Sequence, residues 1–418
     1  MAILKNEPLF SFEEGNYCKP RHIIVQGSYE EIGYDLAKLA QKEYGCSTLG
    51  PYADPIYGAA RRDYFANNWP SMNERSKGAR RAFGLAENDN SYDASGLPFD
   101  LYDVQRKAPI EKATMCSALV LPKEKTGDGK GVFVGRNWDM NNTPIWSAFV
   151  GKEAPEGAFG CGERCVVMEV RPDTGYKHIL IGAHELMTPL LDGMNEKGLY
   201  TTALMDPEAK GEFAGPLTGE RINGITSVQL QAFLLETCAT VEEAKKKILQ
   251  SRIIQVAVVI HLLIVDGEGN AMIFEIDPVT QEYIFTDRKP GEPLFVTNHS
   301  VETHPTSDTY PAFTKENEHN TFNRMCMLNE AYDKKIAAMN KGEALKKSDA
   351  RELIDVVKCG FVDCKKAQCV ESERTLINVS CDLSKRQLSA RFYLKDIGQV
   401  EGTNQIDFER SGWYDFSL

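Results

Sequence analysis

Short apolar runs, each of a length typical of a β-strand, follow one another along the chain from residue 116 onward. Helical spacing interrupts them over residues 226–250, in two pieces, and again over roughly 321–338 and 348–358. Hairpins followed by helices and more strands predict helical layers on antiparallel sheet, and not alternating βαβ units. The strand-like runs are 119–121, 132–134, 165–170, 178–181, 200–204, 261–265, 271–275 and 294–297.

The part of the chain before residue 116 begins with a predicted strand at 22–25, followed by a helix. Ser28 and Glu31 form a capping-box pattern, and apolar residues then repeat at helical spacing. Residues 50–110 are rich in Asn, Asp, Arg and Gly, and their helical pattern is broken. With no repeat or linker visible, we expect one catalytic unit with an N-terminal segment.

Composition restricts the class of protein. A chain of 418 residues that is 42% hydrophobic and 26% charged is expected to fold into a globular protein. The net charge of −12 offers no basic field for nucleic acid. The sequence shows neither a secretory signal nor an apolar run of the ~20 residues that span a membrane. We therefore expect a cytoplasmic protein without a membrane partner, whose eleven cysteines are mostly reduced thiols.

One predicted hairpin carries reactive residues at its open end. "CSALVLP" and "GVFVGRNWD" flank "KEKTGDGKG", which has the residues that a reversing turn requires. Depending on the centre of the turn, Cys116 is predicted opposite Asp139 or Asn141. In either register Cys116 shares a face with Asn137 and Asp139, and Arg136 points to the other face.

A cysteine beside a carboxylate needs a further group to become a nucleophile, because nearby negative charge raises the pKa of a thiol. A histidine is one possible base. Another is the α-amino group of Cys116 itself, which would exist if the Met115–Cys116 bond were cut. Asp139 would then hold that amine, and Arg136 would offset the carboxylate. The simpler interpretation is a buried cysteine near a strand end that is closed by a surface ion pair.

Several motifs resemble one known family in their order along the chain. They are "IIVQGSYEEIGYDLAKLA", "MCSALVLP" with "VFVGRNWDM", "LDGMNEKGLYTTAL", "HLLIVDGEGNAMIFE" and "FVTNHS". Together they resemble the autoproteolytic acyltransferase and choloylglycine hydrolase family, which includes penicillin acyltransferase, penicillin V acylase and bile salt hydrolases. The resemblance covers roughly residues 22–395, and its most specific part is the cysteine followed by Gly-Arg-Asn-Trp-Asp.

The resemblance implies an α+β fold of the N-terminal-nucleophile type, a four-layer αββα sandwich with two antiparallel sheets between helical layers. By position, Cys116 would be the nucleophile, and Arg136 and Asp139 would orient its amine. Asn298 would help to bind the oxyanion. Two arginines match different branches of the family, Arg324 the bile salt branch and Arg374 the acyltransferase branch, and we expect both to line the pocket, with Arg374 preferred.

The same resemblance implies self-cleavage between Met115 and Cys116. Residues 1–115 would be released as a segment that stays docked, and residues 116–418 would form the catalytic chain. The expected enzyme cleaves a linear amide bond in a small molecule through a Cys116 thioester. It passes the acyl group to water or to an amine. Met205 stands where the bile salt branch has an oxyanion asparagine, which argues against that branch. The alternative is an unprocessed, noncatalytic or metal-binding relative.

The remaining cysteines and glycines do not predict a cofactor. Cys161 and Cys165 in "CGERC", and the three cysteines of "CGFVDCKKAQC", lack the spacing of a zinc knuckle. We interpret them as packed or surface thiols and predict no metal. "VQGSYEE" lacks the glycine spacing of a phosphate-binding loop, so no nucleotide is expected. Homo-oligomerisation is left open.

Overall fold

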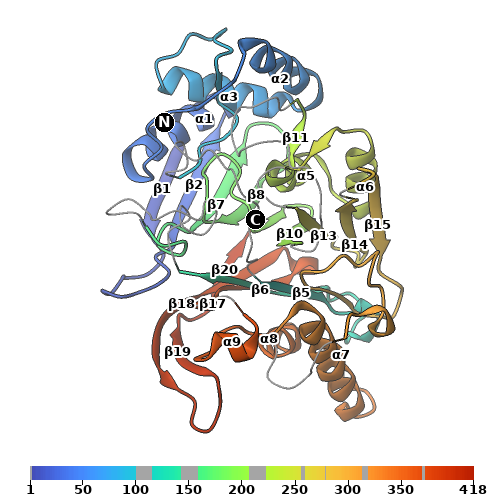
Figure 1. The fold of residues 1–418 in the computed structure, drawn as a ribbon. Helices are drawn as coiled ribbons and strands as arrows, with labels where there is room; N and C mark the ends of the chain where they lie inside the picture. The colour runs from blue at the N-terminus through green and yellow to red at the C-terminus, as the bar shows by residue number, and fades with distance from the viewer. Residues whose placement is uncertain are drawn as a thin grey trace.

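The computed structural model describes residues 2–99, 115–142, 159–206, 223–255, 259–277, 279–312, 319–369 and 372–418. Within these residues, two β-sheets face one another across a shared apolar core, and helices cover the outer face of each sheet (Figure 1). The layers are therefore helix, sheet, sheet and helix. This arrangement confirms the predicted αββα sandwich.

The first sheet contains strands from both sides of position 116. Its neighbours pair antiparallel, except that β2 and β7 run parallel. In spatial order the described strands are β1 (Ile3–Pro8), β2 (Arg21–Gly27), β7 (Val166–Pro172), β8 (His178–Gly182), β9 (Asp192–Asn195), β10 (Tyr200–Met205), β13 (Ile260–Val265), β14 (Ala271–Ile276) and β15 (Tyr283–Asp287). The N-terminal segment is thus an integral part of this sheet.

The second sheet carries the predicted hairpin near its middle, and all its pairs are antiparallel. In spatial order the described strands are β16 (Leu294–Val296), β5 (Cys116–Val120), β6 (Phe133–Asn141), β17 (Glu373–Asp382), β18 (Gln387–Gln399) and β19 (Ile406–Arg410), and β20 (Tyr414–Ser417) also pairs with β18. All the apolar runs predicted as strands overlap a strand of one of the two sheets.

The helices form the two outer layers, which lie at opposite ends of the molecule in Figure 1. On the first sheet pack α1 (Tyr29–Glu43), α2 (Pro55–Asn68), α3 (Pro70–Ala82), α5 (Leu230–Thr237) and α6 (Val241–Leu249). On the second pack α7 (Thr321–Ala338) and α8 (Lys347–Asp355), with the short α9 (Cys364–Ala367) following in the chain. Smaller pairs are β3 (Gly50–Pro51) with β4 (Tyr92–Asp93) and β11 (Ile225–Thr226) with β12 (Ile253–Ile254), and 3₁₀ turns lie at Lys123–Lys125, Ser227–Gln229, Ser307–Thr309 and Leu383–Lys385.

Helix α1 begins where its sequence predicts. The Ser28 hydroxyl accepts a hydrogen bond from the Glu31 N–H at 3.3 Å, and the Glu31 carboxylate accepts one from the Ser28 N–H at 3.3 Å. These reciprocal bonds satisfy two donors that the first turn of a helix leaves without partners. The capping box therefore fixes the point at which the chain leaves β2.

Residues 55–82 form two regular helices, which corrects the expectation of a broken helical pattern. Both helices have a proline in the first helical position, which suits a helix start. Their inward faces contain the buried arginines Arg61, Arg75 and Arg80. Because these residues count as polar, the apolar repeat of both helices is hidden in the sequence. Arg75 of α3 forms an ion pair with Glu236 of α5, so a buried charge pair joins α3 to α5.

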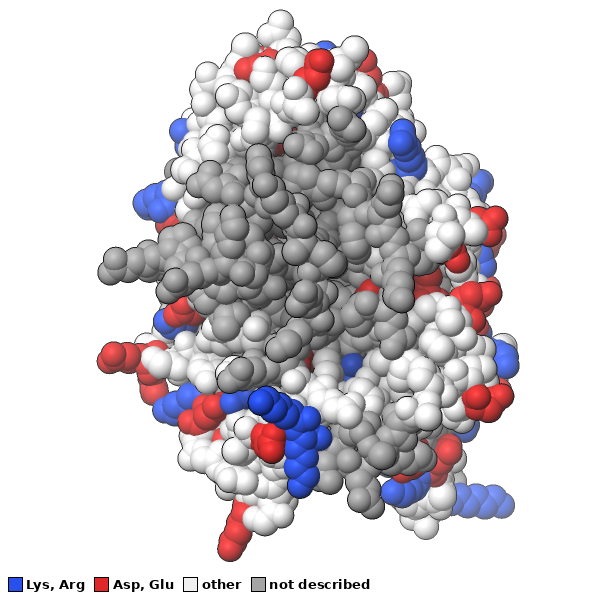
Figure 2. Space-filling view, in the orientation of Figure 1, with Lys and Arg blue, Asp and Glu red and all other residues white. Residues whose placement is uncertain are grey.

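Among the described residues, no helix is both long enough and apolar enough to cross a membrane. On the face of the molecule in Figure 2, acidic and basic side chains of the described residues are interspersed around the periphery. Charges of both signs therefore lie on this face, although the net charge of the chain is −12.

The Arg75–Glu236 pair should be a large contributor to stability, since both side chains are at most 2% exposed. We predict that Arg75→Ala lowers the free energy of unfolding by about 3–5 kcal/mol, because it leaves a buried carboxylate without its cation. Urea denaturation followed by circular dichroism measures this change. The partly exposed Lys77, paired with Glu74, is the matched control, and Lys77→Ala should have little effect. Equal effects at the two positions would contradict the prediction.

Candidate active site

Strand β5 begins at Cys116, and its pairing with β6 differs from the predicted register. Cys116 lies opposite Trp138, and Ala118 lies opposite Arg136. Because side chains alternate between the two faces of a strand, Arg136 shares the face of Cys116, and Asp139 lies on the other face. The predicted facing of Cys116 with Asp139 or Asn141 is therefore wrong.

The connection between the two strands explains the shift. The chain does not reverse in a two-residue turn centred on Gly127 or Asp128. It first forms the 3₁₀ turn Lys123–Lys125 and a bond from the Gly129 N–H to the Thr126 carbonyl, and pairing then resumes where the Leu121 N–H donates to the Phe133 carbonyl. A longer connection of this kind fixes a register that turn residues alone do not reveal.

Arg136 points toward the thiol of Cys116. Its Nη2 atom lies 3.4 Å from the Cys116 Sγ, and its side chain is fully buried between the sheets. The guanidinium is oriented by the opposite sheet: Nε lies 3.5 Å from Asp192 Oδ2 on β9 and donates to Thr202 Oγ1 on β10 at 3.2 Å. Among the described residues, Nη1 of Arg136 has no hydrogen-bond partner.

Cys116 is 3% exposed, and this burial keeps its thiol mostly protonated in the uncleaved chain. Burial raises the pKa of Cys116 to about 11, although the Arg136 guanidinium lowers it and so limits the rise. Asp139 raises the pKa further. The thiol is therefore mostly protonated near neutral pH, and a nearby base is needed before it can act as a nucleophile.

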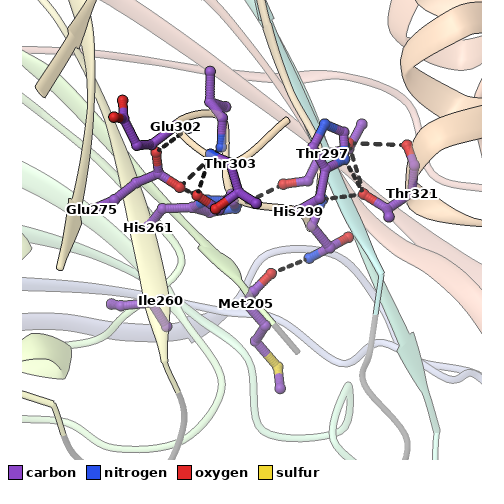
Figure 3. A network of polar contacts seen from close by, with 12 residues as sticks. Met205, Ile260, His261, Glu275, Thr297, His299, Glu302, Thr303 and Thr321 are labelled. Atoms are coloured by element: carbon purple, nitrogen blue, oxygen red, sulfur yellow. Dashed lines mark hydrogen bonds and ion pairs between the residues drawn. The ribbon is translucent and has the colours of Figure 1, made fainter. Parts of the chain in front are cut away.

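Asn298 follows β16 and contacts the backbone of Cys116. Its carboxamide Oδ1 accepts a hydrogen bond from the Cys116 N–H at 2.6 Å. Its Nδ2 donates to the Met205 carbonyl at 2.6 Å (Figure 3). The backbone of Met205, the residue that departs from the bile salt pattern, therefore positions the carboxamide. Asn298 therefore belongs to the candidate site, and its contact there is the hydrogen bond from the Cys116 N–H.

The two candidate arginines occupy different places. Arg324 of α7 donates to the Cys116 carbonyl at 2.5 Å, and its Nη2 donates to Asn298 Oδ1 at 2.8 Å. Arg374 of β17 instead forms a bidentate pair with Asp396, at 2.9 and 3.1 Å. That both arginines line the pocket, with Arg374 preferred, stays a prediction: Arg324 contacts Cys116 directly, whereas the guanidinium of Arg374 pairs with Asp396 of β18.

Asp139 contacts the residue before Cys116. Its backbone N–H donates to the Met115 carbonyl at 2.9 Å, and its Oδ1 accepts from Thr375 Oγ1 at 2.5 Å. Among the described residues, its Oδ2 has no hydrogen-bond partner. Burial raises the pKa of Asp139 to about 6, and the cation of Arg324 limits the rise. The carboxyl group is thus mostly ionised at neutral pH and retains one acceptor atom.

The structure adds residues that the sequence analysis did not identify. Glu373 Oε1 accepts a hydrogen bond from the Met115 N–H at 2.7 Å, and Thr375 orients Asp139. Both flank Arg374 on β17, so the alternation of side chains places them on the face opposite to Arg374. Glu373 and Thr375 could have been found because they are sequence neighbours of Arg374. Asp192 and Thr202, which hold Arg136, are far from it in sequence and lie on the facing sheet.

A polar network holds the loop that presents Asn298 (Figure 3). His261 of β13 lies 2.7 Å from the Thr297 carbonyl through Nε2 and 3.4 Å from Glu275 Oε1 through Nδ1. Glu275 also accepts the N–H groups of Val301 and Glu302. The residues on both sides of Asn298 are therefore bonded to strands of the first sheet.

Two groups of described side chains have the composition of metal ligands. Asp206, His261 and Glu275 form one, and Cys359, Cys369 and Glu373 form the other; in each group the ligand atoms lie within 4.8 Å of one another. In the first group, His261 and Glu275 already contact each other. The second group lies at the start of β17.

The four-layer αββα sandwich is the fold that was expected for the N-terminal-nucleophile type. The sequence model of the acyl-coenzyme A:6-aminopenicillanic acid acyl-transferase family matches residues 125–393, and the chain belongs to this family. The matched range includes Arg136, Asp139, Asn298 and Arg324 but begins after Cys116.

Solved structures with a similar arrangement come from two bacteria. A variant of conjugated bile acid hydrolase from Clostridium perfringens is 14% identical, with a TM-score of 0.45, and the match covers 72% of this chain and 97% of the other. Penicillin V acylase from Agrobacterium tumefaciens is 15% identical, with a TM-score of 0.43, over 70% of this chain and 84% of the other. A search of curated proteins finds no match.

The His261–Glu275 pair predicts a pH-dependent contribution to stability. Burial lowers the pKa of His261, but Glu275, Asp206 and the Thr297 carbonyl together raise it more, so the net pKa lies above the ordinary 6.5. Burial raises the pKa of Glu275, but His261 and the N–H groups of Val301 and Glu302 together lower it more, so the net pKa lies below 4.5. The stabilisation is therefore complete between pH 4.5 and 6.5 and is lost as pH rises through the folded-state pKa of His261.

We expect Glu275→Gln to destabilise the protein more at about pH 5.5 than at about pH 8.5. Urea denaturation at the two pH values measures the difference. Glu302→Gln changes an exposed carboxylate in the same loop and should show no such dependence. An equal loss for Glu275→Gln at both pH values would contradict a charged pair.

Proposed function

We propose that this member of the family is a self-processing cysteine amidohydrolase or acyltransferase with Cys116 as its nucleophile. One observation carries the proposal: every polar atom of the Met115–Cys116 peptide group is bonded to a site residue. The Met115 carbonyl accepts from the Asp139 N–H at 2.9 Å, and the Cys116 N–H donates to Asn298 at 2.6 Å. A peptide bond held in this way is positioned for attack by the adjacent thiol.

In the proposed self-cleavage, Cys116 Sγ attacks the Met115 carbonyl carbon while its proton passes to a base. Because the Asp139 carboxylate lies on the other face of the sheet from the thiol, the base is the Cys116 nitrogen itself, which takes the proton as it becomes the leaving amine. The Asp139 N–H stabilises the developing oxyanion, and such a donor is typically worth about 3 kcal/mol of barrier. The C–N bond then breaks, which leaves a Met115 thioester and a free Cys116 amine, and water hydrolyses the thioester.

In the proposed turnover, the new amine of Cys116 takes the proton from the thiol, which attacks the carbonyl carbon of the substrate amide. Arg136 stabilises the thiolate, since its Nη2 atom lies 3.4 Å from the sulfur. The protonated amine then donates its proton to the leaving nitrogen, and an acyl thioester on Cys116 remains. Water or an amine completes the reaction. The substrate class is a small molecule with a linear amide.

The N-terminal segment is proposed to stay docked after cleavage. Its strand β2 pairs with β1 on one side and with β7 on the other. Helices α1 and α3 also pack into the core of the first sheet. Release of residues 1–115 would break the β2–β7 pairing and the helix packing, and covalent cleavage alone does not remove these contacts.

Intact mass spectrometry of the purified protein tests self-cleavage. We expect a fragment that begins at Cys116 in the wild type, and neither this fragment nor turnover in Cys116→Ala. Cys238→Ala alters another buried thiol, which packs between the first sheet and its helices, and this variant should still cleave. Cleavage that persists in Cys116→Ala would defeat the proposal, and a wild type that stays full length would favour the noncatalytic relative.

Separate substitution of the two arginines tests which of them contributes to self-cleavage and turnover. Arg324→Met should slow self-cleavage and turnover by about 100-fold or more, because it removes a donor from the Cys116 carbonyl and from Asn298. Arg374→Met is the matched control, and its effect should be much smaller. Assays with acylated amino acids, penicillin V and conjugated bile acids, run beside a time course of fragment formation, give both rates. A larger loss at Arg374 would reverse the assignment.

A further inference from the structure

A second group of reactive side chains lies next to the proposed site, at the start of β17. The Sγ atoms of Cys359 and Cys369 and a carboxylate oxygen of Glu373 lie within 4.8 Å of one another. Cys359 and Glu373 are fully buried, and Cys369 is half-buried. We propose that Cys359, Cys369 and Glu373 form a binding site for a thiophilic divalent cation such as Zn²⁺.

The backbone brings these three residues together in a fixed arrangement. The Thr375 N–H donates to the Cys359 carbonyl at 2.9 Å, and the Cys359 N–H donates to Thr375 Oγ1 at 2.7 Å. Helix α9 then turns the chain back, and the Cys369 N–H donates to the Cys364 carbonyl at 3.0 Å. Cys359 is therefore fixed to β17 through Thr375, and Cys369 is fixed to Cys364, the first residue of α9.

The ligand set suits zinc better than a harder cation. Thiolate sulfur and carboxylate oxygen are both established ligands of Zn²⁺, whereas Mg²⁺ and Ca²⁺ require oxygen alone. Three protein ligands leave a fourth position open. Binding converts two thiols to thiolates, so each cation bound releases two protons and no oxidant or reductant takes part.

The spacing of "CGFVDCKKAQC" did not predict this site, because the third ligand lies outside the run. Glu373 is separated from Cys369 by three residues of sequence and belongs to the strand. A rule that compares cysteine spacings with those of zinc knuckles does not include a carboxylate supplied by a sheet. The expectation of no metal rested on cysteine spacing alone and did not consider a carboxylate ligand.

The site is connected to the proposed scissile bond by direct contacts. Glu373 accepts the Met115 N–H at 2.7 Å, and Thr375, which accepts the Cys359 N–H, donates to Asp139 Oδ1 at 2.5 Å. A cation on Glu373 would therefore place positive charge one side chain away from Met115. The metal site itself does not depend on the proposed reaction.

Zinc binding by the Cys116→Ala chain tests the proposal without any need for turnover. The reduced protein is titrated with Zn²⁺ against a chromophoric chelator, and bound metal is counted by elemental analysis. We expect one Zn²⁺ per chain, and a loss of affinity of at least about tenfold in Cys359→Ser and in Cys369→Ser, since even outer-shell changes cost that much. Cys326→Ser, a half-buried thiol on α7, is the matched control and should bind as tightly as the parent.

Cobalt substitution provides a second measurement that does not depend on the variants. Co²⁺ in the parent chain should give thiolate-to-metal charge-transfer absorption and the visible bands of a tetrahedral site. A reduced parent chain that shows neither tight Zn²⁺ binding nor this spectrum would overturn the proposal. Binding that is unchanged in both serine variants, or an air-stable Cys359–Cys369 disulfide in place of metal, would overturn it as well.

Discussion

The backbone pairing of β5 with β6 determines where every other group of the site must come from. In the observed register, Cys116 and Arg136 face the first sheet, so the groups that orient Arg136 belong to β9 and β10. Asp139 faces the helical layer, so its partners come from β17 and α7. A register slip of one residue would move each β6 side chain to the opposite face relative to β5. The Cys116 thiol would then no longer lie on the same face as the Arg136 guanidinium.

The residues around Cys116 concentrate ionised groups in a part of the protein that excludes water. Arg136, Asp139, Asp192 and Arg324 are all fully buried. Charges at such positions are tolerated only when they are paired and hydrogen-bonded. Even so, one nitrogen of Arg136 and one oxygen of Asp139 have no partner among the described residues. Unbonded polar atoms are rare in folded interiors, and here they adjoin the group that the proposed mechanism alters.

Much of the architecture follows from local pattern. Apolar runs and the Ser28 capping box predict the strands and the start of α1, because buried strands and helix caps leave signals within a few residues. Helices α2 and α3 left no such signal, since Arg61 and Arg75 occupy inward positions where a hydrophobic pattern expects apolar residues. The class of fold was therefore predictable, whereas the helical content of residues 55–82 was not.

The site was predictable in its members more than in its geometry. Motif order identified Cys116 and Asn298, which the structure places in contact through the backbone. It placed Arg374 ahead of Arg324, because motif order does not include Asp396, a residue of another strand that pairs with Arg374. Glu373 and the facing-sheet partner Asp192 depend equally on long-range packing, which spacing along the chain does not encode.

The position of β2 inside the first sheet has a consequence for any form of the protein that lacks its first hundred residues. Without β2, the backbone groups of β7 on that side would lose their partners, and a long apolar strand would become a sheet edge. Such an edge pairs readily with other chains. A shortened gene product would thus be expected to self-associate. In the full chain, β2 prevents this by pairing with β7.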